Sequence, residues 1–217
     1  MLPRGRHDLS REVVAHSQRD RLIDAMAQTA ATKGYANASI SDVCAAAGVS
    51  TKAFYTHFAD KEACFLATYD RGVGLVRTTM LDAHTRPGPW AKRTREGLEL
   101  LLRILAHEPA FASLAVVEVM AAGPRALERQ RETLAEYMIF FADAPHRAGW
   151  PVIPDEVVRA VIAGIYGRIH ECISTGRTGD LPGLLPDLTY FALAPFVGPR
   201  TAATVAGLEP RTDPATA

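Results

Sequence analysis

The chain has 217 residues, 24 of them basic and 24 acidic, so its formal net charge is zero. This length suits one large domain or two smaller ones. A neutral total neither predicts nor excludes a nucleic-acid partner, because DNA binding depends on a local patch of charge. Between residues 1 and 61, eight Lys and Arg residues stand against six Asp and Glu residues, which is only a modest basic excess.

Apolar runs are interrupted by charges or prolines before they reach the length of a membrane span, and the N-terminus lacks the apolar segment of a signal peptide. Three cysteines, Cys44, Cys64 and Cys172, lie far apart and make no metal-ligand spacing. Each falls in an apolar helical pattern, where cysteine usually behaves as a small buried side chain. We expect a cytoplasmic protein with no membrane segment, metal or cofactor.

Residues 1–16 begin with a stretch rich in Pro, Gly and Arg and predict a flexible arm. Arg4 and Arg6 suit insertion into a minor groove, and a disordered tail without that role is an equally good interpretation. Helical periodicity then begins at about Ser17 and ends at Gly34.

Residues 39–62 predict two short helices joined by a tight turn. Ser39 and Asp42 have the spacing of a capping box, and apolar residues repeat at helical spacing through residues 40–47. Gly48 suits the left-handed position that often ends a helix. A helix, a glycine-containing turn and a second helix form the helix-turn-helix of DNA-binding proteins.

The second of these helices has a polar face that suits DNA. A recognition helix needs short side chains at its start, to approach base edges, and donors farther along for phosphates. We expect base-edge contacts from Thr51, Lys52 and Ala53. The alternative is an ordinary helix–helix corner whose polar face is merely solvated. The full set of residues expected at the DNA is Ser39, Ser41, Ser50, Thr51, Lys52, Ala53, Tyr55, His57 and Lys61.

The run from Gly34 to Ala67, GYANASISDVCAAAGVSTKAFYTHFADKEACFLA, resembles the N-terminal domain of TetR-type transcriptional regulators. The shared features are a glycine–aromatic pair, the AGVS turn, an aromatic-rich recognition helix and the Lys-Glu pair that opens a fourth helix. Lys52 is a departure, because the family often has a small residue there. The resemblance implies an N-terminal DNA-binding domain, a C-terminal domain for ligand binding and dimerisation, and a palindromic operator.

The rest of the chain predicts helices only, so the expected fold class is all-α. A long helix from about residue 60 to residue 84 follows the helix-turn-helix, and a Pro- and Gly-rich break comes directly after it. We expect a DNA-binding domain with this connecting helix at 17–84, a helical bundle at 85–197 and a disordered tail at 198–217. Within the bundle, helices are expected at residues 90–108, 109–123, 124–146, 154–176 and 180–197.

A dimer seam is expected on the helix at residues 155–175, together with the last helix of the bundle. Small side chains there permit close approach, and apolar neighbours add area. The alternative is that both helices are simply core of one chain. The seam residues are Val157, Ala160, Val161, Ala163, Gly164, Ile165, Gly167 and Ile169, with Leu184, Leu188, Phe191 and Leu193.

The resemblance also implies an inducer pocket within the C-terminal helices. Aromatic side chains suit the wall of an apolar cavity, although aromatics at helical spacing are also typical of ordinary core. Glu118 is a candidate polar group, and a salt bridge to Arg103 or Arg125 is the alternative. The candidate ligand-binding residues are Trp90, Phe111, Glu118, Tyr137, Phe141, Tyr166 and His170.

These patterns together predict a homodimeric, sequence-specific transcriptional regulator, a repressor that a small molecule releases from its operator. A helical enzyme is one rival, yet no His-Glu-x-x-His, Ser-x-x-Lys or Gly-x-Ser-x-Gly motif is present. A helical adaptor that has lost DNA contact is the other. The intact set of phosphate donors argues against the adaptor.

Overall fold

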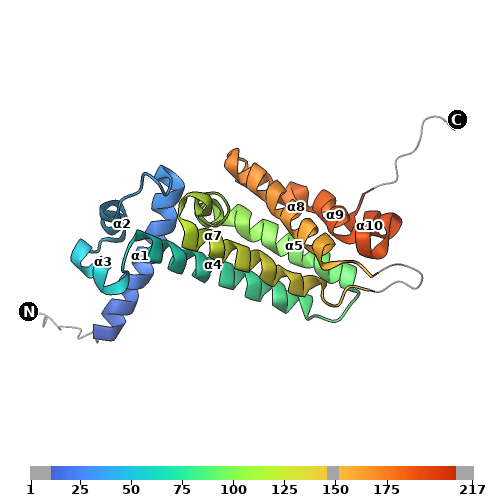
Figure 1. Ribbon diagram of the computed structural model, residues 1–217, viewed down its shortest axis with the longest axis horizontal. Coiled ribbons are helices and arrows are strands. Elements are labelled where there is room, and N and C mark those ends of the chain that lie inside the picture. Colours follow the sequence, from blue (N-terminus) through green and yellow to red (C-terminus); the bar gives the residue numbers. More distant parts are fainter. Residues whose placement is uncertain (1–10, 146–151, 209–217) are drawn as a thin grey trace, which may run out of the picture.

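The computed structural model describes residues 11–145 and 152–208, and every element within these segments is a helix (Figure 1). The expected all-α class is confirmed. The elements are α1 Arg11–Lys33, α2 Ile40–Ala47, α3 Thr51–His57, α4 Lys61–His84, α5 Trp90–His107, α6 Pro109–Val116, η1 Glu118–Ala121, α7 Pro124–Glu136, η2 Tyr137–Phe141, α8 Asp155–Ser174, η3 Thr178–Leu184, α9 Leu185–Val197 and α10 Pro199–Ala206, where η marks a 3₁₀ helix.

Short local signals determine the ends of α2. The Ser39 hydroxyl accepts a hydrogen bond from the Asp42 amide (3.1 Å), and the Asp42 carboxylate accepts one from the Ser39 amide (2.9 Å), which completes the expected capping box. Gly48 ends the helix at φ +61°, where a side chain would be strained. The Arg21 guanidinium donates to the carbonyl of Ala47 (3.1 Å), so α1 also secures this end.

The first three helices are packed against α4 around one apolar core. Leu22, Ile23 and Met26 of α1, Phe54 of α3 and Phe65 of α4 are fully buried. Three short helices bury too little surface to be stable alone, and α4 closes their core.

α4 belongs to both parts of the molecule. Its 24 residues span about 36 Å, and Figure 1 shows it running from the helix-turn-helix along α5 and α7. Near its start Phe65 lies in the N-terminal core, whereas Val76 and Met80 lie in a separate cluster with Phe140. α4 therefore contributes side chains to the cores of both parts of the molecule.

Both ends of the chain are more helical than expected. α1 begins at Arg11, so residues 11–16 are not part of an arm, and residues 1–10 lie outside the described residues. The predicted disordered tail is wrong for residues 199–206, which form α10. Pro199 opens this helix, Gly207 closes it at φ +74°, and Ala202 and Ala206 are buried. Small side chains let α10 pack closely on α9, an effect that composition alone does not reveal. Residues 209–217 lie outside the described residues.

Some helices of the bundle are shorter than expected. The segment at 109–123 leaves α-helical geometry after Val116 and continues as the 3₁₀ turn η1, and the segment at 124–146 changes to η2 after Glu136. In the last segment, Pro182 lies within η3 and Pro186 in the first turn of α9. A proline suits a first turn but removes a donor from a helix interior, so the segment divides there. No helix among the described residues is both long and apolar enough to cross a membrane.

Candidate DNA-binding surface and ligand cavity

The helix α3 separates its buried and exposed sides as expected. Phe54 is fully buried and Phe58 is nearly so, whereas Tyr55 is 57% exposed. Thr51 and Lys52, in the first turn, are exposed. The start of α3 therefore faces solvent with short side chains and one lysine, as an approach to base edges requires.

The three serines of this region differ in what their hydroxyls do. Ser50 caps α3, accepting a hydrogen bond from the Ala53 amide at 3.1 Å. The Ser39 hydroxyl accepts from the Asp42 amide and donates to the Asp42 carboxylate (2.7 Å), so it is committed to the cap rather than offered to a phosphate. The prediction of a phosphate contact through this hydroxyl is corrected accordingly. Ser41 is exposed.

Asp42 also anchors α1 to α2. Lys33 donates to its carboxylate at 2.6 Å, and this bond, with those from Ser39, holds the pKa of Asp42 well below its usual range. The carboxylate thus stays ionised next to the predicted DNA surface. The Arg19 guanidinium lies 5.3 Å from the centre of the Phe58 ring.

Lys61 has a structural role instead of the predicted phosphate contact. Its ammonium donates to the carbonyls of Tyr35 and Ala38, both at 2.8 Å, and lies 4.1 Å from the centre of the Tyr35 ring. Burial lowers the pKa of Lys61. The Lys61 side chain links the loop after α1 to the start of α4.

His57 is half-buried, with Nε2 3.4 Å from the side-chain oxygen of Gln18.

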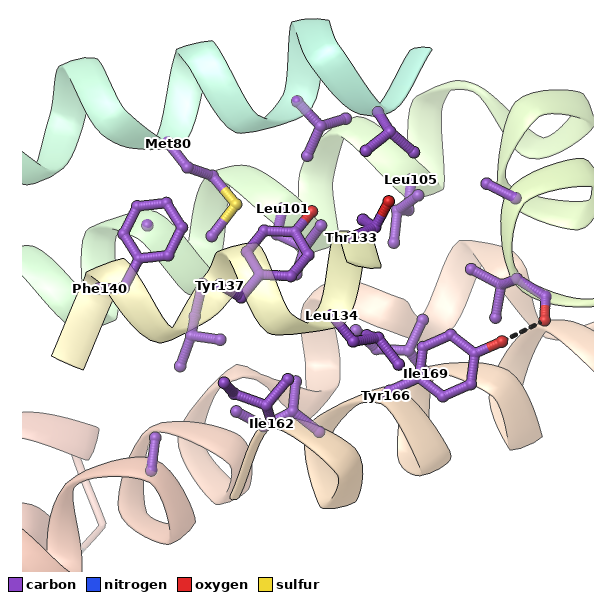
Figure 2. Close-up of a pocket in the computed structure, with 18 of the residues that line it drawn as sticks. Met80, Leu101, Leu105, Thr133, Leu134, Tyr137, Phe140, Ile162, Tyr166 and Ile169 are labelled. Carbon is purple, nitrogen blue, oxygen red and sulfur yellow. Dashed lines mark hydrogen bonds between the residues drawn. The ribbon is translucent and has the colours of Figure 1, made fainter. Parts of the chain in front are cut away.

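A cavity of about 120 Å³ lies between α4, α5, α6, α7, η2 and α8, and α9 adds one lining residue (Figure 2). Most of its wall is apolar. Four of the seven predicted ligand-binding residues line it, namely Phe111, Tyr137, Phe141 and Tyr166. Figure 2 shows Phe140 and Met80 at one end, with Leu105 and Tyr166 toward the other.

The tyrosines of the wall are held by burial and hydrogen bonds. Tyr166 donates to the carbonyl of Val116 at 2.7 Å, the bond drawn in Figure 2, and accepts from the Gln130 amide. Burial raises the pKa of Tyr166 to about 12 and also raises that of Tyr137. Both phenols are therefore neutral near pH 7.

The other three predicted ligand residues do not line the cavity. The Trp90 indole N–H donates to the carbonyl of Phe140 (3.0 Å), and its ring packs against Phe196. His170 lies beside Tyr166 without reaching the cavity. Each is a correction, because the helix faces that point inward depend on how the helices pack.

Glu118, the third of these residues, also lies outside the cavity, and it contacts the DNA-binding domain instead. Its carboxylate accepts a hydrogen bond from the Tyr35 amide at 2.6 Å, so η1 holds the loop that follows α1. Neither Arg103 nor Arg125 pairs with it among the described ion pairs; Arg125 lies 3.4 Å from Glu62 and 3.6 Å from Asp60. Polar links from η1 and from α7 thus join the C-terminal helices to the DNA-binding domain.

Sequence reasoning missed most of the cavity wall. On α4 the lining residues recur every three or four positions, a pattern that indicates a buried face without telling core from cavity. The missed residues include Tyr69, Val73, Val76, Met80, His84, Arg93, Thr94, Gly97, Leu98, Leu101, Leu105, Ala115, Gln130, Thr133, Leu134, Ile162, Ile165 and Ile169.

Some residues of the predicted dimer seam are buried within this chain, and others are exposed. Val161, Ile165 and Ile169 of α8 are buried within this chain, as are Leu188 and Leu193 of α9, so these five do not belong to an exposed seam. On the outer side, small residues of α8 remain exposed beside Phe191, which is 45% exposed. These small residues are Ala160, Ala163 and Gly167, with Gly164 half-buried beneath the Phe191 ring.

Residues 22–68 match the sequence model described as bacterial regulatory proteins, tetR family. No curated protein matches the chain in sequence. The exposed recognition helix on a helix-turn-helix, joined to a helical domain, defines a DNA-binding transcriptional regulator. More narrowly, residues 22–68 carry the sequence pattern of the tetR family model.

Solved structures share this fold over most of the chain. The fatty acid degradation regulator FadR from Bacillus halodurans is similar with a TM-score of 0.72 and 18% identity, over 81% of this chain and 94% of that one. FadR from Bacillus subtilis, in complex with stearoyl-CoA, has a TM-score of 0.70 and 16% identity, over 82% and 98%. A gamma-butyrolactone receptor, an ArpA-like protein, has a TM-score of 0.63 and 19% identity, over 89% and 96%.

Proposed function

We propose that this protein is a homodimeric cytoplasmic repressor, and that a small molecule in the cavity between α4 and α8 releases it from a palindromic operator. The observation that carries this proposal is that the wall of an apolar cavity includes α4, the same helix that closes the core of the DNA-binding domain. Similar folds described as a stearoyl-CoA complex and as a gamma-butyrolactone receptor support a small-molecule ligand.

On DNA, two copies of α3 enter successive major grooves about 34–36 Å apart. Thr51, Lys52 and Ala53 contact base edges, and Tyr55 and His57 contact phosphates, as does Ser41 at the start of α2. Two-fold symmetry comes from the outer face of α8 and α9, where small side chains permit close approach of a second copy.

Ligand binding is transmitted through α6. Phe111 lines the cavity and lies directly on Gly72 of α4, where an added Cβ would overlap its ring. Val116 also lines the cavity, and two residues later Glu118 holds the Tyr35 amide. A ligand that moves α6 therefore moves both α4 and the loop before the helix-turn-helix, and favours a state whose recognition helices no longer match the operator.

The test is selection of bound sequences from random duplex DNA by the purified full-length protein at physiological salt. A palindromic site is expected. Tyr55→Phe should then weaken binding to all variants of that site by a similar factor, whereas Lys52→Ala should change the preferred bases. If a verified dimer enriches no sequence, the proposal fails and the adaptor becomes the better interpretation. Equal losses on all variants for Lys52→Ala would refute its assignment to a base.

A further inference from the structure

We propose that the cavity takes an amphiphile with one extended alkyl chain and an anionic head group, the head lying beside Arg93 and Arg86. This inference rests on the proposed ligand-dependent function and adds the chemistry and orientation of the ligand. Three observations carry it: the shape of the cavity, the pairing of polar groups at its inner end, and a buried guanidinium N–H without a partner at its outer end.

The cavity is long and narrow. Its lining on α4 runs from Tyr69 to His84, which is about 22 Å at 1.5 Å per residue, and on α5 from Leu105 to Arg93. A cavity of about 150 Å³ holds one benzene molecule, whereas the roughly 120 Å³ here extends along four turns of helix. This volume is smaller than that of a benzene site, so a ligand must part the lining helices as it enters. A single alkyl chain needs the least separation along such a path, whereas a compact multi-ring ligand needs a wide space in one place.

At the inner end, the polar groups already have partners within the protein. The Tyr166 hydroxyl donates to the carbonyl of Val116 and accepts from Gln130. The Thr133 hydroxyl donates to the carbonyl of Arg129 at 2.9 Å. These groups are neutral and satisfied, so this end offers hydrocarbon contact and no charge for a head group.

The outer end has the opposite character. His84 and Arg93 line both the cavity and an open groove of about 530 Å³ at the surface. Their side chains are only 12% and 15% exposed, and His84 Nδ1 and Arg93 Nε are buried without a hydrogen-bond partner among the described residues. Asp143 pairs with both side chains, and the exposed Arg86 adds a further guanidinium, so positive charge exceeds negative charge in this groove.

A buried N–H without a partner is unfavourable, and an anion that enters the groove supplies the missing acceptor. Guanidinium groups pair well with both carboxylates and phosphates. A free fatty acid and an acyl thioester of coenzyme A share this chemistry, an alkyl chain that ends at an anionic group.

The head group is tested by titration calorimetry of the full-length protein with hexadecanoate, hexadecanol and hexadecanoyl-CoA, each below its aggregation threshold. At least one anionic compound is expected to bind about tenfold or more tightly than the alcohol. The tighter anion identifies the source of the head group. Equal affinity for the alcohol and both anions would overturn the proposal.

Arg86→Gln and Arg93→Gln are each expected to reduce this preference severalfold. Arg86 is exposed, so its variant keeps the test valid if Arg93→Gln proves unstable. Lys92→Gln is the matched control, because it removes the same charge from an exposed residue outside the groove. An unchanged preference in Arg86→Gln and in folded Arg93→Gln contradicts the assignment of the head group.

The alkyl chain is tested at Gly97, a lining residue of α5. A Cβ there would meet only the Met80 methyl group, at 3.8 Å, so Gly97→Ala fits and should bind within about threefold of the parent. Gly97→Phe places a ring in the channel and should lose all three compounds, with thermal unfolding used to confirm that it folds. Retained binding in folded Gly97→Phe refutes the position of the chain.

Operator affinity, measured by fluorescence anisotropy with the same compounds, separates the two proposals. If the anions bind as described and the operator stays bound, the ligand chemistry is correct and ligand-driven release fails. If other compounds release the operator while none of these amphiphiles binds, release is correct and the ligand chemistry fails.

Discussion

The two ends of α4 lie in surroundings of different density. Near its start, Cys64 and Phe65 are fully buried in the closed core of the helix-turn-helix domain, and polar side chains secure the neighbouring helix ends. Toward its end, Val76 and Met80 face a cavity between the helices of the bundle. One helix therefore joins a filled core to a hollow one.

This difference fits two tasks. Contact with base edges requires α3 to keep one position, because a hydrogen bond is lost when its atoms shift by a fraction of its length. A ligand site requires space that a filled core does not leave. The cavity lowers the packing density of the helical bundle and leaves the core around α3 filled. Because α4 packs in both regions, a ligand in the cavity can still act on the helix-turn-helix.

Truncation of a large side chain gives the largest expected contrast. Phe54→Ala should lower the free energy of unfolding by about 3–5 kcal/mol, because the fully buried ring leaves a void in a filled core. Phe141→Ala should cost clearly less, since that ring is half-buried and removing it enlarges an existing cavity. Denaturant unfolding measures both, and equal losses would remove the contrast between the two regions.

Glycine replacement on α4 tests the contact with α6. A Cβ at Gly72 would overlap the Phe111 ring, so Gly72→Ala should lower stability by up to about 3 kcal/mol and shift α6. Gly74→Ala is the control, because no atom lies within 4 Å of a Cβ there. It should raise stability by about 0.5–1 kcal/mol, as expected for glycine in a helix interior. A neutral Gly72→Ala would show that α6 is not packed tightly on α4.

Replacement of two lysines near the predicted DNA surface should have different effects, one on stability and the other on operator binding. Lys61→Met should lower stability by about 1 kcal/mol, because two carbonyls lose a donor, and should leave the salt dependence of operator binding unchanged. Lys52→Met should leave stability within about 0.5 kcal/mol. If Lys52 also lies near phosphate, its replacement lowers the slope of log affinity against log salt by about one. A lower slope for Lys61→Met would restore its predicted phosphate contact.

The smallest expected effect concerns the link through Glu118. Glu118→Gln weakens the charge-assisted bond to the Tyr35 amide and should change operator affinity by about 0.5–1 kcal/mol. Glu128→Gln, which removes an exposed charge on α7, should have no measurable effect. Fluorescence anisotropy with the selected operator compares the two. Identical operator affinities for the two variants would show that the Glu118–Tyr35 hydrogen bond does not couple the C-terminal helices to DNA binding.

The helix-turn-helix could be predicted because its signals are local. The capping box at Ser39 and Asp42, the left-handed Gly48 and the inward pair Phe54 and Phe58 each involve residues within a few positions of one another. Such neighbours interact in almost any fold that contains the helix, so the sequence indicates the structure directly.

The misplaced residues act over long separations in the chain. Glu118 binds an amide 83 positions away, Trp90 binds a carbonyl 50 positions away, and Lys61 caps a loop 23 to 26 positions back. Their partners depend on helix crossing and rotation, which the periodicity of one helix does not contain. The same reason explains α10, whose buried alanines pack against α9 and α5.

By itself, the sequence determined an all-α chain, a helix-turn-helix between residues 39 and 58, and a resemblance to one family of regulators. The tertiary structure decided which apolar faces meet to fill a core and which enclose a cavity, and it placed a buried, unpaired guanidinium N–H at one end of that cavity. The physical reason is that hydrophobic periodicity marks a face for burial, while the space left between faces is a property of several helices at once.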